Sequence, residues 1–258
     1  MRKSLQIYFE FIIETALEAG KITLGKFPPK NRFSIKEDGS PVTEVDRETE
    51  LFIRSKIEKR FPTHDIVGEE FRSDTEKRNG FRWFIDPIDG TNYFIRGIPL
   101  YSTIIGLEID GVVEVGLLYF PARGDLLVAA TGMGCWWNGK PAHVSSVNNL
   151  ADGIVAYSDI LNFGKYGKAE EFSHISAACH YRAGWSDGLG YLFAATGRVE
   201  LMIEAVVGVW DVAPYPVIFR EAGGFFGNWQ GEETIYSDQV MACNREVLPQ
   251  VIDLLNSS

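Results

Sequence analysis

Cysteine is scarce in this chain of 258 residues. The three that it has, Cys135, Cys179 and Cys243, are far apart, odd in number and outside any CxxC or Cys/His spacing. A disulfide framework and a zinc site of the usual spacing are therefore not expected. Internal repeats and low-complexity tracts are missing too, so the sequence indicates neither a solenoid nor a disordered protein.

Long apolar runs are also missing. Every apolar stretch is short and interrupted by charge, so we predict no transmembrane span. The N-terminal segment is amphipathic and carries Glu10, Glu14 and Glu18, unlike the uninterrupted apolar core of a signal peptide. We therefore expect a cytoplasmic protein.

Positive charge is in short supply. The chain has 25 Lys and Arg against 35 Asp and Glu, which gives a formal net charge of −10. A nucleic-acid or anionic-membrane partner would need a basic patch, so neither is expected. An acidic protein that binds a phosphate must offset its own charge, and bound divalent cations would do so.

What the chain does contain is a change of hydrophobic period. Apolar residues recur at helical spacing over residues 5–26 and again from Thr43 to about Phe61. From about 81 to 145 the pattern is that of strands, with a strong hairpin signal at Asn138-Gly139. Further on, the pattern predicts strands at 154–157 and 199–203 and helices at roughly 168–180, 187–197 and 212–222. With 45% apolar residues, the sequence predicts an α+β chain whose sheets are sandwiched between helices.

The hexapeptide Asp-Pro-Ile-Asp-Gly-Thr, which begins at Asp86, follows an apolar run. We expect a buried strand that breaks into a tight turn at Pro87 and Gly90. Asp86 and Asp89 could then point to one place together with the amides of Gly90 and Thr91. Carboxylate oxygens suit Mg²⁺, and exposed amides suit a phosphate. The alternative is an Asx-turn in which both acids only cap backbone groups.

Other acids stand next to expected strand or helix ends. Glu69 and Glu70 follow a short strand, Asp211 precedes a helix, and Asp46 stands three residues after Thr43 at the start of another. Each has a local explanation. The glutamates would be solvated, Asp211 would be an N-cap, and Thr43 with Asp46 would form a capping box. The order of all these motifs along the chain is more informative than any one of them.

That order resembles the inositol monophosphatase family of metal-dependent, lithium-sensitive phosphatases. The motifs that carry the resemblance are Gly-Glu-Glu at 68–70, Asp-Pro-Ile-Asp-Gly-Thr at 86–91, Trp-Asp-Val-Ala at 210–213 and Glu-Ala-Gly-Gly at 221–224, with Lys36, Val42-Thr43, Gly139 and Ala195-Thr196-Gly197 also fitting. The resemblance implies a layered αβαβα sandwich and, usually, a homodimer. It also implies an N-terminal half, 1–145, with the metal site and a C-terminal half, 146–258, with the substrate pocket and the last metal ligand. The two halves would be intimately packed or form one domain.

The resemblance also implies roles for single residues. Two or three Mg²⁺ ions would be held by Glu69, Asp86, Asp89, Asp211 and the carbonyl of Ile88. The amides of Gly90 and Thr91 would bind the phosphate, Asp46 would accept from the Thr91 hydroxyl, and Glu69 with that pair would orient a metal-activated water. The ions would lower the pKa of the water, neutralise phosphate oxygens and stabilise the leaving alkoxide. The water would attack phosphorus in line, with no covalent enzyme intermediate.

Two other hypotheses could explain these motifs: a phosphatase of another family, and a protein without catalytic activity. A haloacid-dehalogenase-type phosphatase uses DxDGT, with its two acids two residues apart. Here Asp86 and Asp89 are three apart with Pro87 between them, which argues against a phospho-aspartate. A non-catalytic structural or regulatory descendant would be expected to have lost a ligand, and none is missing.

The substrate is indicated by the second half of the chain. Asp187, within Trp185-Ser186-Asp187-Gly188-Leu189-Gly190-Tyr191, stands where inositol-type members carry a small residue. With Glu204, the family's substrate-binding acid, it favours a cationic group such as an amine or an imidazolium. This stretch, 94–101 and 135–139 resemble the histidinol-phosphate phosphatase branch. They imply L-histidinol phosphate as the small phosphorylated metabolite, a place in histidine biosynthesis, and Asp187, Glu204 and Ser186 as substrate-binding residues.

Alternatives remain at this end of the chain. Asp187 could be the N-cap of the following helix, and the substrate could be inositol 1-phosphate or a related sugar phosphate. Pro214 and Pro216 stand where the family has small helical residues. Because Pro216 would remove an internal bond from a helix that begins at Asp211, we expect that helix to begin late or to bend.

Overall fold

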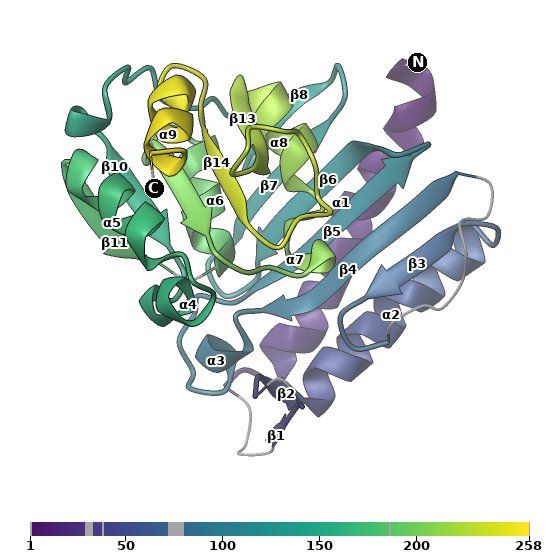
Figure 1. Cartoon of the computed structure of the whole chain (residues 1–258). Helices are drawn as coiled ribbons and strands as arrows, with labels where there is room; N and C mark the ends of the chain where they lie inside the picture. The colour runs from purple at the N-terminus through teal and green to yellow at the C-terminus, as the bar shows by residue number, and fades with distance from the viewer. Residues whose placement is uncertain (1, 29–32, 38, 72–79, 186, 258) are drawn as a thin grey trace.

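The computed structural model describes residues 2–28, 33–37, 39–71, 80–185 and 187–257 (Figure 1). Its α-helices are α1 (Arg2–Gly25), α2 (Glu44–Arg60), α3 (Thr91–Phe94), α4 (Ile160–Lys165), α5 (Ala169–Ala178), α6 (Asp187–Ala195), α7 (Val209–Val212), α8 (Tyr215–Ala222) and α9 (Leu248–Leu255), and a 3-10 turn spans Leu150–Asp152. In the parts of the chain given above, no helix is long and apolar enough to cross a membrane.

The strands form two large sheets and a small hairpin. The seven-stranded sheet has the order β3 (Asp65–Gly68), β4 (Phe81–Asp89), β5 (Ser102–Ile109), β6 (Val112–Phe120), β7 (Asp125–Ala130), β8 (Gly134–Trp137), β9 (Lys140–Pro141). The five-stranded sheet has the order β11 (Tyr181–Gly184), β10 (Ile154–Tyr157), β12 (Leu201–Glu204), β14 (Val240–Asn244), β13 (Gly224–Asn228). The hairpin pairs β1 (Phe33–Ile35) with β2 (Pro41–Thr43). In the seven-stranded sheet β3 and β4 are parallel and the later pairs are antiparallel.

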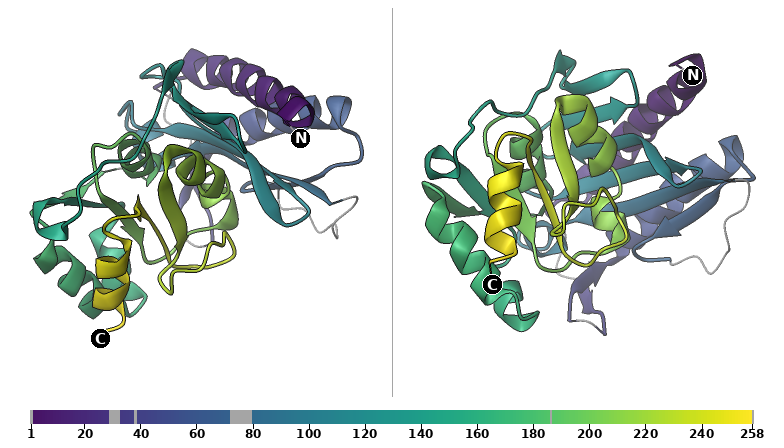
Figure 2. Two further views of the ribbon diagram at one scale, coloured as in Figure 1. Left: turned by 90° about the horizontal axis from the view of Figure 1, so that it is seen from above. Right: turned by 45° about the horizontal axis from the view of Figure 1, so that its top comes forward.

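Helices and sheets alternate in five layers. One apolar cluster joins α1 and α2 to one face of the seven-stranded sheet, and a second joins α6 and α8 to the facing sides of both sheets. A third joins α5 and α9 to the outer face of the five-stranded sheet. Seen from above in Figure 2, α1 and α2 lie on one side of the seven-stranded sheet and the C-terminal half lies on the other. The expected αβαβα sandwich is confirmed.

Strand β4 is buried on both faces. Trp83 and Ile85 belong to the cluster with α1 and α2, whereas Phe84, between them, packs into the cluster with α6 and α8. Successive side chains of a strand point to opposite faces, so an uninterrupted apolar run is typical of a central strand. The acids that follow this run therefore begin inside the molecule.

The end of β4 differs from the expectation. The strand does not break at Pro87 but continues to Asp89, with a shift in its pairing to β5 between Asp86 and Asp89. A proline is tolerated there because a bulge does not require its missing N–H. The expected turn at Gly90 is confirmed: its φ of 78° is the left-handed conformation that glycine adopts without strain, and α3 begins at the next residue.

The expected helix over 212–222 is two short helices, α7 and α8. Pro216 lies in the first turn of α8, where a missing N–H costs no intrahelical bond, and Pro214 immediately precedes that helix. The late start is confirmed, but the N-cap role of Asp211 is wrong. Asp211 is the third residue of α7, and Gly208 stands at the cap.

Other expectations are met. Thr43 caps α2 and forms the predicted capping box with Asp46. The three cysteines are free and buried. The seven-stranded sheet ends at Pro141 and the five-stranded sheet begins at Ile154, yet α8 contacts β6, β7 and β8. The division into halves at 145 and 146 stays a prediction.

Candidate active site

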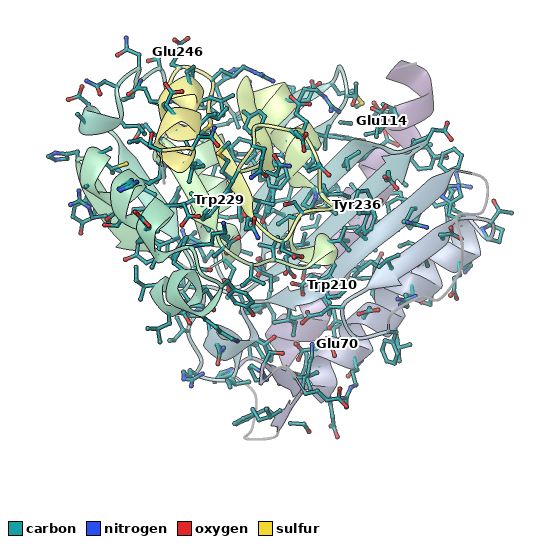
Figure 3. All side chains as sticks on the ribbon, viewed as in Figure 1. Glu70, Glu114, Trp210, Trp229, Tyr236 and Glu246 are labelled. Carbon is teal, nitrogen blue, oxygen red and sulfur yellow. The ribbon has the colours of Figure 1, made fainter. Side chains whose placement is uncertain are left out.

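A pocket of about 400 Å³ opens where the ends of β3, β4 and β12 meet the starts of α3, α6 and α7. Most of the acids singled out in the sequence line it: Glu69, Asp86, Asp89, Asp187, Glu204 and Asp211. Figure 3 labels Glu70 and Trp210, the chain neighbours of two of these acids, and shows both toward the ends of β3 and β4. The structure thus brings together residues that are far apart along the chain.

The bulge at the end of β4 orients its two acids. Asp86 accepts a hydrogen bond from the N–H of Ile88 at 3.0 Å, and Asp89 accepts from the N–H of Gly188 at 2.9 Å and from the Ser102 hydroxyl at 2.7 Å. Asp86 and Asp89 are only 2% and 6% exposed. Because both are tied to the protein, they line the pocket in a fixed direction. The Asx-type bond of Asp86 exists beside its place in the pocket and does not exclude it.

Glu69 reaches the same pocket from the neighbouring strand. Its N–H donates to the Ile85 carbonyl at 3.1 Å, which continues the parallel pairing of β3 with β4. Its carboxylate is ion-paired with Lys36 at 2.7 Å, and Lys36 also contacts Glu70 at 2.5 Å. Burial alone would lower the pKa of Lys36, but the charges of and hydrogen bonds to the two glutamates raise it above its ordinary value. The sequence only showed that Lys36 fits a family pattern, not that it neutralises this edge.

Asp211 is carried in by α7. Its carboxylate accepts from the N–H of Gly208 at 2.7 Å, so it closes the start of its own helix. The segment after it packs directly on the sheet: a Cβ on Gly106 would lie 2.9 Å from Ala213, and one on Gly116 would lie 2.6 Å from the Pro214 carbonyl. The two glycines are register partners on β5 and β6. This close approach of helix to sheet places Asp211 beside the end of β4.

Four acids of the pocket carry like charges that repel one another, namely Glu69, Asp86, Asp89 and Asp211. Burial raises the pKa of Asp86 well above its ordinary range, and the charges of Glu69, Asp89 and Asp211 raise it further. Burial is also the largest cause of the raised pKa values of Asp89 and Asp211, and their acidic neighbours add to it. The pKa of Glu69 is raised by burial too, although the Lys36 charge opposes the shift. The arrangement concentrates negative charge that a cation would neutralise.

The donors fit a hard divalent cation. They are carboxylate oxygens, and the carbonyl of Ile88 belongs to a residue that lines the same pocket. Among the described residues, no three His, Cys, Asp or Glu side chains are already arranged to hold a metal ion. The acids converge on one pocket without closing around one point, and Lys36 supplies the positive charge next to Glu69.

The turn after β4 brings a hydroxyl and two amides to the pocket. The Thr91 Oγ1 lies 3.0 Å from an oxygen of Asp46 and 3.0 Å from the Ile88 carbonyl, so its single proton is donated to one of them at a time. Asp46 is fully buried, and that burial raises its pKa. Gly90 and Thr91 stand at the start of α3, where the first N–H groups have no acceptor within the helix.

Two further acids line the pocket, and the charge of one of them, Asp187, also acts on Asp89. Glu204, the last residue of β12, accepts from the Tyr191 hydroxyl at 2.6 Å. Burial and the charge of Asp187 raise the pKa of Glu204 to about 7. Burial also raises the pKa of Asp187 to about 6, with contributions from Asp159 and Glu69. Asp187 is the first residue of α6 and not the residue before it, which argues against the simple N-cap role. Ser186 lies outside the described residues.

Part of the pocket wall was not predicted from the sequence. Ser158, Asp159 and Asn162, from the end of β10 and the start of α4, also line the pocket. Asp159 caps α4 by accepting from the N–H of Leu161 at 2.9 Å. A Ser-Asp pair after an apolar strand is a common helix start, so the pattern alone does not distinguish it from a binding wall.

Comparison with known proteins agrees with the fold. The family model described as the inositol monophosphatase family matches residues 4–258. A histidinol-phosphatase from Chlorobaculum parvum is 35% identical over 227 residues, covering 88% of this chain and 87% of that protein. Inositol monophosphatase 3 from Solanum lycopersicum is 32% identical over 262 residues, covering 98% of each. The structure of the Thermotoga maritima IMPase is similar with a TM-score of 0.86, at 26% identity and 96% coverage of each chain.

Proposed function

The chain belongs to the inositol monophosphatase family and is a phosphatase, and we propose that it hydrolyses L-histidinol phosphate with two or three bound Mg²⁺ ions. One observation carries the proposal. A single pocket is lined by four acids suited to divalent cations, which we call the metal end, and by the buried Glu204 and the half-buried Asp187, suited to a cationic substrate group, which we call the substrate end. The products would be L-histidinol and phosphate.

At the metal end, the ions would be held by Glu69, Asp86, Asp89, Asp211 and the carbonyl of Ile88. Bound Mg²⁺ would lower the pKa of a water, neutralise phosphate oxygens and stabilise the leaving alkoxide. The hydrogen bonds from Ile88, Gly188 and Gly208 hold three of these carboxylates in place before an ion arrives. Such preorganisation reduces the free-energy cost of bringing like charges together at the moment of binding.

The turn that follows β4 would handle the phosphate and the water. The amides of Gly90 and Thr91 would donate to phosphate oxygens at the start of α3. Because the Thr91 hydroxyl donates to Asp46 or Ile88, its oxygen can accept a hydrogen bond from the attacking water. Glu69 would orient the same water. A new P–O bond would form in line as the ester P–O bond breaks, and the leaving alkoxide would become an alcohol by taking up a proton that the attacking water gives up.

At the substrate end, Asp187 and Glu204 would bind the amino and imidazole groups. Burial raises the pKa of Glu204 to about 7, and the two acids are close enough for the charge of Asp187 to contribute to that rise. A cation between them would relieve that repulsion, whereas the hydroxyl groups of a polyol would not. The similarity to the Chlorobaculum parvum histidinol-phosphatase supports this choice.

The second candidate is a phosphatase of inositol 1-phosphate or of a range of sugar phosphates. The similarity to the tomato inositol monophosphatase 3, which extends over 98% of the chain, favours it. The residues argue against a non-catalytic structural or regulatory descendant, since every proposed ligand is present and lines one pocket.

A panel of phosphate esters tests the proposal. Purified protein with millimolar Mg²⁺ should turn over L-histidinol phosphate with a kcat/KM roughly 100-fold above that for inositol 1-phosphate, since a site built around specific polar contacts discriminates strongly. Equal values for the two esters would favour the second candidate. If no ester in the panel is hydrolysed, the enzyme assignment fails as a whole.

A further inference from the structure

Glu50 on α2 is a fully buried acid that does not line the pocket. Its carboxylate accepts from the N–H of Glu70 at 2.7 Å and from the N–H of Phe71 at 3.2 Å. Arg54, one helical turn later, is ion-paired with Glu50 at 2.7 Å, and its guanidinium also donates to the Phe71 carbonyl. Glu50 and Arg54, on one face of α2, thus bind the N–H groups of Glu70 and Phe71 and the carbonyl of Phe71 in the segment that follows β3.

These hydrogen bonds fix the backbone next to Glu69. The N–H of Glu69 is bound to the Ile85 carbonyl on one side, and the N–H of Glu70 is bound to Glu50 on the other. The two peptide units that flank the Cα of Glu69 are therefore both fixed. The direction in which the Glu69 side chain leaves the backbone follows from that constraint.

The Glu50 carboxylate occupies the space that a side chain at position 68 would need, and position 68 is a glycine. A Cβ built on Gly68 would lie 1.9 Å from Glu50 Oε1 and 2.4 Å from its carboxyl carbon. Any other residue at this position would push the carboxylate away from the amides of Glu70 and Phe71. The glycine is explained by the acid that faces it rather than by its own backbone angles.

Helix α2 holds two separate parts of the pocket in this way. Asp46 contacts the Thr91 hydroxyl after β4, and Glu50, four residues later, contacts the backbone after β3. Residues four apart lie on the same face of a helix. The relative position of Glu69 and Thr91 thus depends on one rigid element.

We propose that Glu50 is a positioning residue of the metal site, which sets the direction of Glu69 through the Glu70 amide. The inference rests on the proposed function, because it assumes that Glu69 is a metal ligand. It assigns Glu50 no contact with metal or substrate. Partners behind the ligands of a metal site typically change its affinity about 10-fold to 100-fold when they are replaced.

The substitution Glu50→Gln tests this role with little change in size. A glutamine places an NH₂ group where one carboxylate oxygen accepted, so a backbone N–H or Arg54 loses its acceptor. We expect Mn²⁺ to bind about 10-fold more weakly, as measured by the electron paramagnetic resonance signal of free Mn²⁺. The Mg²⁺ concentration for half-maximal velocity should rise in parallel, while kcat at saturating Mg²⁺ stays within about threefold.

Glu48→Gln is the matched control. It makes the same chemical change on the same helix, but the Glu48 side chain is 48% exposed and is paired with Lys26. Mn²⁺ affinity should stay within about twofold of the wild type, because exposed ion pairs contribute little. Gly68→Ala should weaken Mn²⁺ binding like Glu50→Gln, and the two changes combined should add little to either one alone.

The outcomes separate the inference from the proposed function. If the wild type binds no Mn²⁺, the proposed metal site fails. If the wild type binds Mn²⁺ and Glu50→Gln binds it equally well with only a lower Tm, Glu50 is structural and the inference is overturned. Should Glu50→Gln not fold, Arg54→Lys decides, since it keeps the charge and loses the planar contact with Phe71. It should bind Mn²⁺ about threefold more weakly, and unchanged binding would overturn the inference.

Discussion

The two ends of the pocket are held in place by different means. At the metal end, Asp86, Asp89 and Asp211 each accept a hydrogen bond from a backbone N–H. At the substrate end, Glu204 is held by the side chain of Tyr191. A backbone donor persists whatever residue carries it, whereas a side-chain donor disappears with one substitution. Backbone donors therefore hold three of the four acids of the metal end, with Glu69 paired to the Lys36 side chain, whereas Glu204 at the substrate end depends on the side chain of Tyr191.

This contrast has a measurable consequence. A change at the metal end should reduce hydrolysis of every ester, because the phosphate group is common to all of them. A change at the substrate end should reduce hydrolysis of esters with a cationic group and spare the others. If variants at the two ends affected all esters equally, the proposed difference between the two ends would be wrong.

The largest effect is expected for Asp89→Asn. Asparagine can still accept from Gly188 and Ser102, so the local structure should persist while one negative charge is lost. We expect turnover of any ester to fall about 1,000-fold or more, since a divalent ion would lose a charged ligand. Steady-state kinetics with L-histidinol phosphate and 2-glycerophosphate at saturating Mg²⁺ measure this. Activity within tenfold of the wild type would argue against the metal mechanism.

Asp187→Ala should reduce hydrolysis of L-histidinol phosphate much more than hydrolysis of an ester without a cationic group. We expect kcat/KM for L-histidinol phosphate to fall roughly 100-fold, because a half-buried charge partner of the substrate is removed. For 2-glycerophosphate, which carries no cation, the fall should be less than about fivefold. Equal losses on the two esters would make Asp187 a structural residue at the start of α6.

The metal end was the more predictable part of the sequence. Its acids stand in contiguous motifs next to strand and helix ends, where the direction of the chain is limited. Local details at this end still differed from expectation. The strand continues past Pro87 because a bulge accommodates it, and Asp211 lies within α7 because the prolines after it divide the helix in two. The division of the helix was indicated by Pro216, whereas the continuation of β4 past Pro87 was not, since it depends on the pairing with β5.

The substrate end was less predictable for a physical reason. Asp159 and Asn162 come from a short helix whose first residues look like an ordinary cap, and only the tertiary structure brings them to the pocket. Glu50 was equally hidden, because a glutamate in an amphipathic helix is normally exposed. The sequence shows a glycine, Gly68, before the two glutamates, but only the structure gives the reason for it: its φ is not positive, and the space that it leaves is filled by Glu50.

The raised pKa values predict how stability depends on pH. A raised pKa means that the folded protein retains protons that the unfolded chain has already released, so the free energy of unfolding falls as pH rises through that window. For Glu204 and Asp187 the window lies between their ordinary values and about 7 and 6. Without divalent ions, Tm should therefore be higher at pH 5 than at pH 7, by about 3 °C or more.

Magnesium should reverse that trend. It binds ionised carboxylates, so it should raise Tm more at pH 7 than at pH 5. Differential scanning calorimetry at the two pH values, with and without Mg²⁺, measures both effects. In the double variant Asp86→Asn, Asp89→Asn, the pH dependence should be shallower and the Mg²⁺ effect smaller. A wild-type Tm that rises from pH 5 to pH 7 without Mg²⁺ would contradict the buried-acid account.

The smallest effect is expected for Tyr191→Phe, with Tyr215→Phe as its matched control. The two rings are stacked with centroids 3.9 Å apart, but only the Tyr191 hydroxyl donates to Glu204. In the part of the chain that the structure describes, the Tyr215 hydroxyl has no hydrogen-bond partner. Tyr191→Phe should lower the free energy of unfolding by about 1–2 kcal/mol, whereas Tyr215→Phe should be nearly neutral. Equal losses in urea unfolding would show that the Glu204 contact contributes nothing.

The central claim is that divalent ions bind between four carboxylates of the pocket, those of Glu69, Asp86, Asp89 and Asp211. A crystal grown with Mn²⁺ tests it most directly, because Mn²⁺ takes the ligands of Mg²⁺ and gives an anomalous signal. The account predicts anomalous peaks within coordination distance of these four carboxylates and of the Ile88 carbonyl. A crystal containing Mn²⁺ whose peaks lie elsewhere, with the four acids still uncoordinated, would contradict it.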